Sequence, residues 1–238
     1  MIHYLITSTR RAGTRYLCSM LQGLKIGNPK EITLYEYPHL NSIEKIYESG
    51  AAKGVWGGVL HRCHYKEVLK RLRVLSDIKG IDDYTTLFKI FPNIKFIYLH
   101  RIDKVAQAVS LEKALQLEEW WIVNQSGNQA KNVRFNETRI REHIANFYLA
   151  DSEWCGFFRH NGIIPLHISY EELEETPVLQ LKKICDFLDV EIPSKIDCVI
   201  NRPAMPQKQF NHVNSNWINR FLERNSVDQY IPFQNKRR

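Results

Sequence analysis

The start of the chain constrains the fold most, because an apolar run leads into a polar loop and then into an amphipathic stretch. Residues 3–8 contain the apolar run, residues 9–15 read TRRAGTR, and apolar positions in residues 14–25 have helical spacing. This order predicts a strand, a tight turn and a helix. The first backbone N–H groups of a helix and its dipole both favour anions, so the loop is a candidate site for phosphate or sulfate.

This loop differs from the phosphate loop of nucleotide kinases and GTPases. That loop follows the pattern G-x-x-x-x-G-K-[S/T], whereas residues 9–15 contain one glycine, Gly13, and no lysine. A plain nucleotide kinase or GTPase is therefore excluded. Two interpretations stay open at this stage: an anion-binding loop, and an ordinary strand-to-helix turn whose arginines, Arg10 and Arg11, are solvated.

Strand and helix patterns alternate along the chain. Short apolar runs predict strands at residues 3–8, 54–60, 94–99 and 165–169, and amphipathic stretches predict helices at residues 14–25, 41–49, 64–75, 102–119, 138–160 and 171–188. The second strand is rich in glycine, which indicates a close approach by backbone or by a ligand. Alternation of this kind implies crossover connections, so we expect an α/β fold with a central parallel sheet and ligands at the carboxyl ends of its strands.

The longest predicted helix carries an apolar stripe at spacings of three and four residues. The stripe consists of five apolar residues and one aspartate: Ile140, Ile144, Phe147, Asp151, Trp154 and Phe158. Such a stripe packs either into the core or into an interface with another molecule, and we favour the core.

Length and composition limit the class of protein. With 238 residues, 44% of them hydrophobic, the chain fits one large domain, 1–238, with a flexible tail over about residues 230–238. Its apolar runs are too short for a transmembrane segment. Five cysteines without C-x-x-C spacing argue against a disulfide framework and a zinc site, which favours a reducing compartment such as the cytoplasm. The net charge of +7 is compatible with nucleic acid, but an anionic nucleotide or polyanionic substrate explains it equally well.

A second candidate anion site follows the third predicted strand. Arg101 stands at the carboxyl end of that strand, and Ser110 lies about two and a half turns into the next helix, within reach of a phosphate near Arg101. The alternatives are an ion pair between Arg101 and Asp103 and a Ser110 hydroxyl that bonds its own backbone.

Three segments together resemble the bacterial trehalose 2-sulfotransferase-like family. They are residues 9–18, Asn28-Pro29-Lys30-Glu31, and residues 101–111 with the sequence RIDKVAQAVSL. The resemblance continues through Lys113-Ala114, Trp120, Trp154, Phe157-Phe158, Tyr170-Glu171-Glu172-Leu173, Lys208-Gln209 and residues 217–221. It covers nearly the whole chain, and the run DKVAQAVSL is its most specific part.

The resemblance implies a fold, a donor and two donor-binding sites. The expected fold is a three-layer αβα sandwich with a central parallel sheet, a P-loop-NTPase-like sulfotransferase fold. The implied donor is 3′-phosphoadenosine 5′-phosphosulfate (PAPS), which leaves as PAP, without a metal. Its 5′ end would lie on the first loop and its 3′-phosphate at Arg101 and Ser110, while Trp120 faces the adenine or belongs to the core. The loop residues are Arg11, Ala12, Gly13, Thr14 and Arg15.

Transfer to an alcohol also needs a base for the hydroxyl proton and cations for the leaving phosphate. Glu31 matches the acidic residue that follows the family's N-P motif, and it is our candidate base. The alternative is that Glu31 is a solvated carboxylate or caps a nearby helix. Arg11 is our candidate for a catalytic cation. His61 and His64 follow the glycine-rich strand and are either substitute bases or structural hydrogen-bonding groups.

The chain departs from the family pattern at three positions. Ala12 lacks the hydroxyl of the family's serine, Arg15 replaces a small threonine, and Val59 stands where the family often has a lysine. The missing charge is then expected to come from Arg10 or Arg15.

The sequence thus predicts a PAPS-dependent sulfotransferase acting on a hydroxyl of a sugar or glycolipid. Two alternatives come from other classes. The first is a catalytically impaired PAP- or nucleotide-binding protein of the same fold, and the second, ranked last, is a nucleic-acid-binding protein. Acceptor contacts are expected in residues 32–42, 121–136 and 201–213. The family makes a homodimer plausible.

Overall fold

The computed structural model describes residues 1–32, 41–80, 82–118, 133–194, 196–198 and 210–225. Backbone contacts divide the chain into two compact units, each of which is described by itself. The first unit comprises Met1–His100 and Ala150–Met205, and the second comprises Arg101–Leu149 and Pro206–Arg238. The expectation of one domain over 1–238 stays a prediction.

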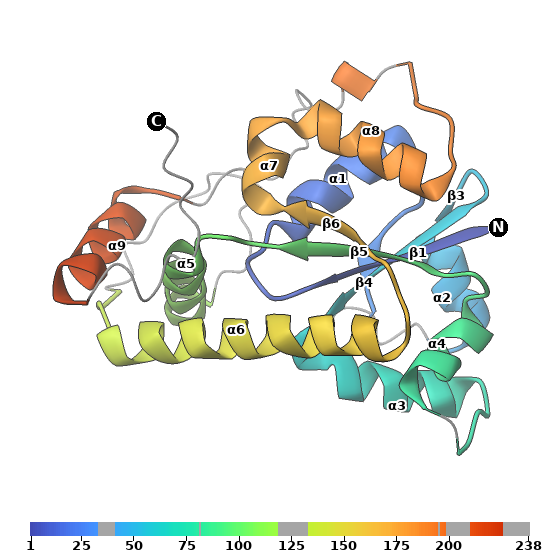
Figure 1. Ribbon diagram of the computed structural model, residues 1–238, viewed down its shortest axis with the longest axis horizontal. Helices are drawn as coiled ribbons and strands as arrows, with labels where there is room; N and C mark the ends of the chain where they lie inside the picture. The colour runs from blue at the N-terminus through green and yellow to red at the C-terminus, as the bar shows by residue number, and fades with distance from the viewer. Residues whose placement is uncertain (33–40, 81, 119–132, 195, 199–209, 226–238) are drawn as a thin grey trace. The chain divides into compact units, whose positions relative to one another are not determined.

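The first unit is built on a central sheet with the strand order β2-β4-β1-β5-β6 (Figure 1). Its strands are β1 (Ile2–Ser8), β2 (Lys30–Glu31), β3 (Ala51–Ala52), β4 (Val55–His61), β5 (Lys95–His100) and β6 (Leu166–Ser169). Every neighbouring pair along this path is parallel, and β3 adds to β4 in the antiparallel sense. The α/β fold with a central parallel sheet is therefore confirmed, and each of the four predicted strands is present within a residue or two of its expected bounds.

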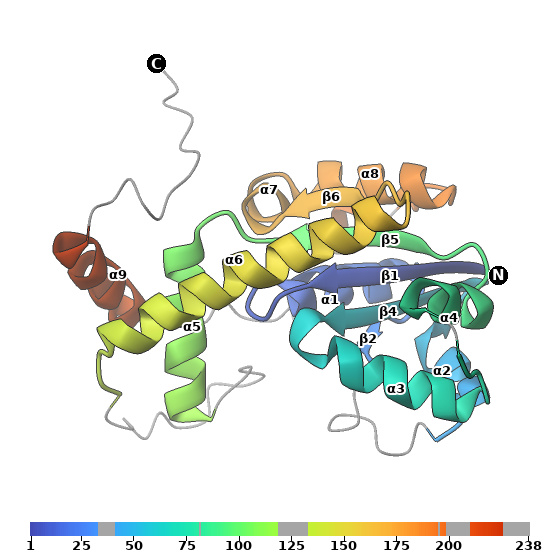
Figure 2. The same cartoon turned by 60° about the horizontal axis from the view of Figure 1, so that its bottom comes forward.

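Helices cover both faces of this sheet and make three layers, as Figures 1 and 2 show. One face carries α1 (Thr14–Leu24), α7 (Tyr170–Glu175) and α8 (Pro177–Leu188). The other carries α2 (Ile43–Gly50), α3 (Tyr65–Leu75), α4 (Asp83–Ile90) and the C-terminal part of α6 (Glu137–His160). Side chains of β1 alternate between the two cores: Tyr4 and Ile6 join the first, and Leu5 joins the second. A central strand buried on both faces requires such an uninterrupted apolar run.

The glycines of β4 serve this double-sided packing. A Cβ atom on Gly57 would lie 2.4 Å from Cζ of Tyr4, and a Cβ atom on Gly58 would lie 2.6 Å from Cη2 of Trp56. Core aromatic side chains therefore fill the space beside these glycines. The close approach predicted for this strand is confirmed: aromatic rings of the core lie against these glycines, and the backbone of Gly57 lies close to Gly27 and Gly50, where an added Cβ atom would be 3.0 Å from Gly57 N and 2.7 Å from Gly57 O respectively.

The second unit consists of α5 (Lys104–Leu117), the N-terminal part of α6 and α9 (His212–Arg224). Its apolar core includes Val109 of α5, Ile144 of α6 and Phe221 of α9. Lys113 links α5 to α9 by donating hydrogen bonds to Asn211 Oδ1 (3.0 Å) and Asn214 Oδ1 (2.8 Å). Lys113 therefore has a structural role in this unit.

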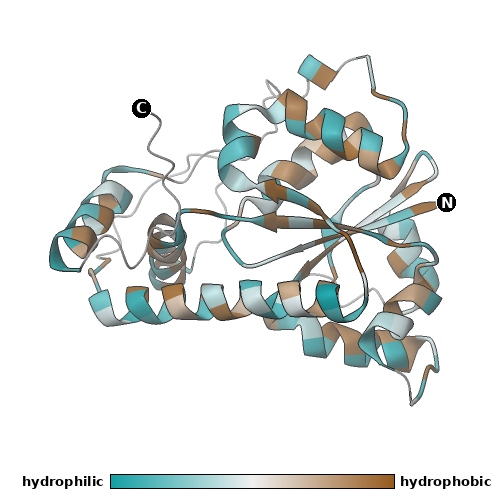
Figure 3. Ribbon diagram, viewed as in Figure 1, coloured by the Kyte–Doolittle hydropathy of each residue, from teal (hydrophilic) through white to brown (hydrophobic). Residues whose placement is uncertain are grey.

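The predicted stripe along α6 is core. Ile140, Ile144 and Phe147 are buried in the apolar core of the second unit, and Trp154 and Phe158 are buried in that of the first. Figure 3 shows brown and teal residues alternating along this helix, as its amphipathic pattern requires. The interface alternative is not needed to explain the stripe.

Several elements differ from the sequence-based expectation. The predicted helix at residues 171–188 is two helices, because Pro177 begins α8 as a residue that cannot donate a backbone hydrogen bond. The expectations missed β2, β3 and α4, and they gave no bounds for α9. Among the helices in the described ranges, none combines the length and apolar character that crossing a bilayer requires.

Candidate active site

The loop between β1 and α1 turns sharply at the carboxyl end of the central strand. Arg11 (φ 62°) and Gly13 (φ 88°) both have left-handed backbone conformations, and Gly13 caps the start of α1. A Cβ atom on Gly13 would lie 2.4 Å from Cδ2 of Tyr170, the first residue of α7. Conformation and space therefore both require glycine here.

The chemistry of this loop suits an anion. The N-terminus of α1 has no side-chain cap, and its first turn contains no acidic residue. Arg10 and Arg11 are half-buried beside it, whereas Arg15 is exposed. Backbone N–H groups and the helix dipole thus favour negative charge at the start of α1, and the two arginines add positive charge to the loop that precedes it. Ala12 is fully buried in the apolar core, so its side chain belongs to the core.

Glu31 is brought to the sheet by the short strand β2. The segment before it is anchored through Asn28, whose backbone N–H donates to Gly50 O and whose side chain donates to Ser49 O, both at 2.8 Å. Glu31 then pairs with Val59 of β4, and the next backbone N–H, that of Ile32, donates to Val59 O at 3.0 Å. The N-P motif therefore sets the position of Glu31 near the carboxyl end of β4.

Four side chains gather here, and we call them the carboxylate cluster: Arg10, Glu31, His61 and His64. Oε1 of Glu31 lies 3.7 Å from Nε2 of His64 and 3.9 Å from Nε2 of His61. Nη2 of Arg10 lies 3.0 Å from the same Nε2 of His64. The predicted base, the two alternative histidines and one of the two candidate cations are thus within a few ångströms of one another.

Both histidines of the cluster are neutral near pH 7. Burial, with further contributions from His64 and Arg10, lowers the pKa of His61 to about 3. Burial and the Arg10 charge also lower the pKa of His64 below its ordinary value of 6.5. Their contacts with Glu31 are consequently not ion pairs, and both are longer than a hydrogen bond.

Hydrogen-bond donors fix the tautomers of these two rings. Arginine only donates, so Nε2 of His64 accepts from Arg10 and carries no proton. The Ser8 hydroxyl donates to Thr9 O at 2.7 Å, which leaves Nδ1 of His61 as the donor in its 3.4 Å contact with Ser8 Oγ. The lone pair of His64 is thus engaged by a cation, which makes His64 a poorer base than the Glu31 carboxylate.

The motif at residues 170–173 supports the loop and the core. Ser169 and Glu172 form a capping box at the start of α7, and the hydrogen bonds from Ser169 lower the pKa of Glu172. Leu173 is fully buried in the core, and Tyr170 lies against Gly13. These roles are structural.

The other predicted donor residues belong to the second unit. Arg101 directly follows β5, Ser110 lies within α5, and both are half-buried. Asp103 caps α5 by accepting from Ala106 N at 2.8 Å, and Arg101 O accepts from Lys104 Nζ. Trp120, Lys208, Gln209 and most of the three segments expected to contact the acceptor lie outside the described residues.

Two contacts at this site were not predicted from the sequence: Arg10 with His64, and Gly13 with Tyr170. Both join segments far apart in the chain, and each depends on the parallel order of the strands. A partial signal exists for the first, because Arg10 and His64 both follow predicted strands at their carboxyl ends, where functional groups converge.

Comparison with known structures identifies the fold first. A sulfotransferase domain from the curacin biosynthetic pathway has a similar fold, with a TM-score of 0.50 and 17% identity over 90% of this chain and 82% of that domain. This likeness and the three-layer architecture confirm the predicted sulfotransferase fold.

The family follows from the sequence match. The model of the Stf0 sulphotransferase family matches residues 38–224, and the chain belongs to this family. A trehalose 2-sulfotransferase from Mycobacterium tuberculosis is 26% identical over 185 residues, which cover 75% of this chain and 65% of the relative. The chain therefore spans about two thirds of the length of that relative. The predicted resemblance to the trehalose 2-sulfotransferase-like family is confirmed.

Proposed function

We propose that the protein transfers the sulfuryl group of PAPS to a hydroxyl of a sugar or glycolipid, with Glu31 as the general base. Membership of a sulfotransferase family supports sulfuryl transfer. The observation that carries the proposal is the position of the Glu31 carboxylate, next to two neutral imidazoles and near the arginine-containing loop. The name of the mycobacterial relative supports a sugar acceptor.

The donor is proposed to bind through both anion sites. Arg11, Gly13 and Thr14 hold its 5′ end by guanidinium and backbone N–H groups, with Ala12 and Arg15 completing the loop. Arg101 and Ser110 bind its 3′-phosphate. The uncapped, acid-free N-terminus of α1 supports the first assignment, and the half-buried position of Arg101 and Ser110 is compatible with the second.

The proposed reaction is an in-line displacement. The acceptor oxygen forms a bond to sulfur while the bond from sulfur to the 5′-phosphate oxygen breaks. Glu31 takes the hydroxyl proton, which is worth on the order of a hundredfold to ten-thousandfold in rate. Arg11 stabilises the negative charge left on the phosphate, and the scheme needs no metal.

A catalytically impaired PAP-binding protein is the second candidate, because Ala12, Arg15 and Val59 depart from the family pattern. Ala12 and Val59 are both buried in the apolar core, so these two departures are compatible with the packing of the fold. We rank transfer above binding alone because the chain belongs to a sulfotransferase family.

Titration of the protein with PAP by calorimetry tests the donor site. We expect a dissociation constant in the micromolar range, about −8 kcal/mol, and at least a tenfold loss in Arg101→Ala. An assay with PAPS and trehalose or related sugars then tests transfer. Binding of PAP without transfer to any hydroxylated acceptor would establish the second candidate. No PAP binding at low salt would refute both.

The proposal includes two further expectations from the sequence. They are a cytoplasmic location and a homodimer. Sedimentation at several protein concentrations measures the oligomeric state.

A further inference from the structure

We propose that His64 is a positioning residue whose Nε2 holds the guanidinium of Arg10 beside Glu31, where Arg10 stabilises the charge that develops on the donor during transfer. This inference rests on the proposed function. It also chooses between the two arginines, Arg10 and Arg15, that the sequence left open as sources of the additional cation.

The geometry favours Arg10. It is half-buried, and its Nη2 donates to His64 Nε2 at 3.0 Å, whereas Arg15 is exposed. Arginine loses rotamer freedom when it is held in one place, and an anchor already made by the protein removes that cost from the reaction. His64 supplies such an anchor, because it ends the turn η1 (Arg62–His64) and directly precedes α3.

His64 also lies close to both Arg10, the proposed cation, and Glu31, the proposed base. Its Nε2 accepts from Arg10 and lies 3.7 Å from Oε1 of Glu31. One imidazole nitrogen is thus close to both groups that the reaction needs, the proton acceptor and the cation. Removing the nitrogen leaves Glu31 on β2 but takes from Arg10 its 3.0 Å contact with His64, one of the contacts of this guanidinium, which also hydrogen-bonds the Cys63 side chain.

The arrangement depends on pH. The charged and titratable groups that face His64 are Arg10 from the loop after β1, Glu31 from β2, His61 from β4 and Glu67 from α3. A proton on Nε2 of His64 removes the acceptor and sets a second positive charge against Arg10. Because the pKa of His64 is lowered, the contact is intact above pH 6.5 and is lost as the pH falls through that lowered value.

Four variants separate positioning from general structure. Arg10→Ala removes the cation, and His64→Leu removes the acceptor. His64→Gln keeps an oxygen acceptor close to the place of Nε2 and does not titrate. Arg62→Ala is the matched control, because it removes another arginine of the same turn, one whose Nε pairs with Glu153 at 2.9 Å.

Kinetics as a function of pH give the first readout. We expect kcat to fall about a hundredfold in Arg10→Ala and by a comparable factor in His64→Leu. His64→Gln should keep kcat near that of the unmodified protein at pH 8 and lose the decline on the acid side that His64 causes. Arg62→Ala should behave like the unmodified protein. A His64→Leu enzyme with unchanged kcat, or a His64→Gln enzyme as slow as His64→Leu, would overturn the proposal.

A second readout is independent of activity. NMR titration of the His64 ring should show a higher pKa in Arg10→Ala, because the neighbouring positive charge is gone. An unchanged His64 pKa would refute the contact itself. If the unmodified protein binds PAP but transfers nothing, the proposed function fails, and this titration still decides whether Arg10 and His64 are coupled.

Discussion

Two glutamates, one in each unit, have histidine and arginine nearby, and they differ in side-chain burial and in the lengths of their contacts with histidine. Glu112 on α5 is almost completely buried; its Oε2 accepts from His143 Nε2 at 3.0 Å and Arg139 Nε at 3.1 Å. Its Oε1 accepts from Gln116 at 2.7 Å. Glu31 on β2 is 19% exposed, and its imidazole contacts are 3.7 and 3.9 Å long.

The difference in burial separates a structural carboxylate from one that a substrate can reach. Short hydrogen bonds to both oxygens of a buried carboxylate stabilise the fold, and burial keeps a substrate away from it. A partly exposed carboxylate at the carboxyl end of a parallel sheet is accessible to a substrate, as the proposed base must be. The expected effects of substitution therefore divide: activity for Glu31 and stability for Glu112.

The largest expected effect is on activity. Glu31→Gln keeps the shape of the side chain but removes the base, so kcat should fall on the order of a hundredfold to ten-thousandfold, with PAP affinity and the melting temperature nearly unchanged. Glu153→Gln is the control, because it alters an exposed acid of the same unit that pairs with Arg62. Full activity in Glu31→Gln would assign the proton to another group.

The next prediction compares two glycines with left-handed backbone conformations, one in the candidate site and one outside it. Gly13→Ala combines a left-handed conformation with a clash against Tyr170, so urea unfolding should show a loss of about 2–4 kcal/mol, and PAP binding should weaken. Gly54→Ala is the matched control. Gly54 has a similar φ of 77° but no atom within 4 Å of its added Cβ, and it should lose only about 1 kcal/mol.

Glu112→Gln should reduce stability without removing a catalytic group. An amide has one acceptor oxygen, so its NH₂ group must face either Gln116 or the pair His143 and Arg139, all of which donate to Glu112. We expect a loss of about 1–3 kcal/mol in urea unfolding. An unchanged free energy of unfolding would mean that Glu112, like Glu31, contributes little to stability.

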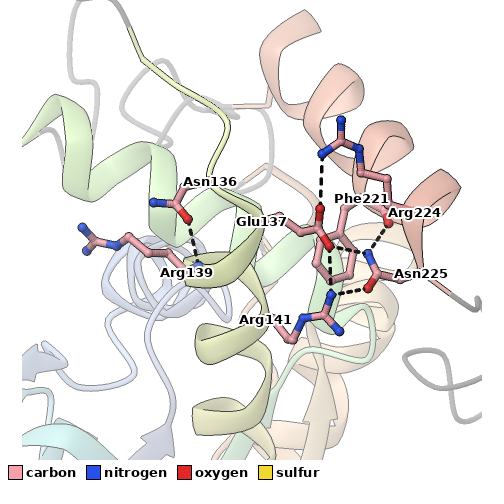
Figure 4. A network of polar contacts seen from close by, with 7 residues as sticks. All are labelled: Asn136, Glu137, Arg139, Arg141, Phe221, Arg224 and Asn225. Atoms are coloured by element: carbon pink, nitrogen blue, oxygen red, sulfur yellow. Dashed lines mark hydrogen bonds and ion pairs between the residues drawn. The ribbon is translucent and has the colours of Figure 1, made fainter.

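The smallest effect is expected at the surface network of the second unit, shown in Figure 4. Glu137 accepts from Arg141 at 2.8 Å and from Arg224 at 3.4 Å, and Arg141 also donates to Asn225 at 2.6 Å. Glu137→Gln should lower the melting temperature slightly, and added salt should reduce the difference. A large effect that persists in high salt would contradict this.

The same network has a pH dependence with a definite sign. Partial desolvation raises the pKa of Glu137, but hydrogen bonds from Arg224, Arg141 and Asn225 outweigh it and lower the pKa below 4.5. The network therefore contributes above pH 4.5 and is lost as the pH falls through the lowered value. The difference between Glu137→Gln and the unmodified protein should disappear in acid.

The sequence predicted most of the first unit because its elements depend on local patterns. β1, β4, β5 and β6 are short apolar runs, and α1 and α3 have apolar faces. β2 was missed because it has only two residues and forms by pairing with β4, far along the chain. α9 was given no bounds although Val213, Trp217 and Phe221 are spaced four residues apart and pack in the core of the second unit, because polar residues fill most of its other positions.

The sequence predicted individual residues of the candidate site but not how they are arranged in space. Glu31, His61 and His64 were each named from the sequence, but the distances among them follow from the alignment of β2 and β4. The contact between Arg10 and His64 requires β1 to lie beside β4 in a register that pairs Ser8 with His61. Local sequence contains no information on such a register, whereas the resemblance to a family did select Glu31.

The central position of β1 has a consequence for the order of events during synthesis. β1 is made before the other strands of this sheet, but its two neighbours in the sheet are β4 and β5, and the second of these ends at His100. Parallel pairing over such sequence separations is slow and cannot precede the arrival of the partner strands. The candidate anion-binding loop therefore precedes both partner strands in sequence, and the sheet cannot hold it in place until β4 and β5 have been made.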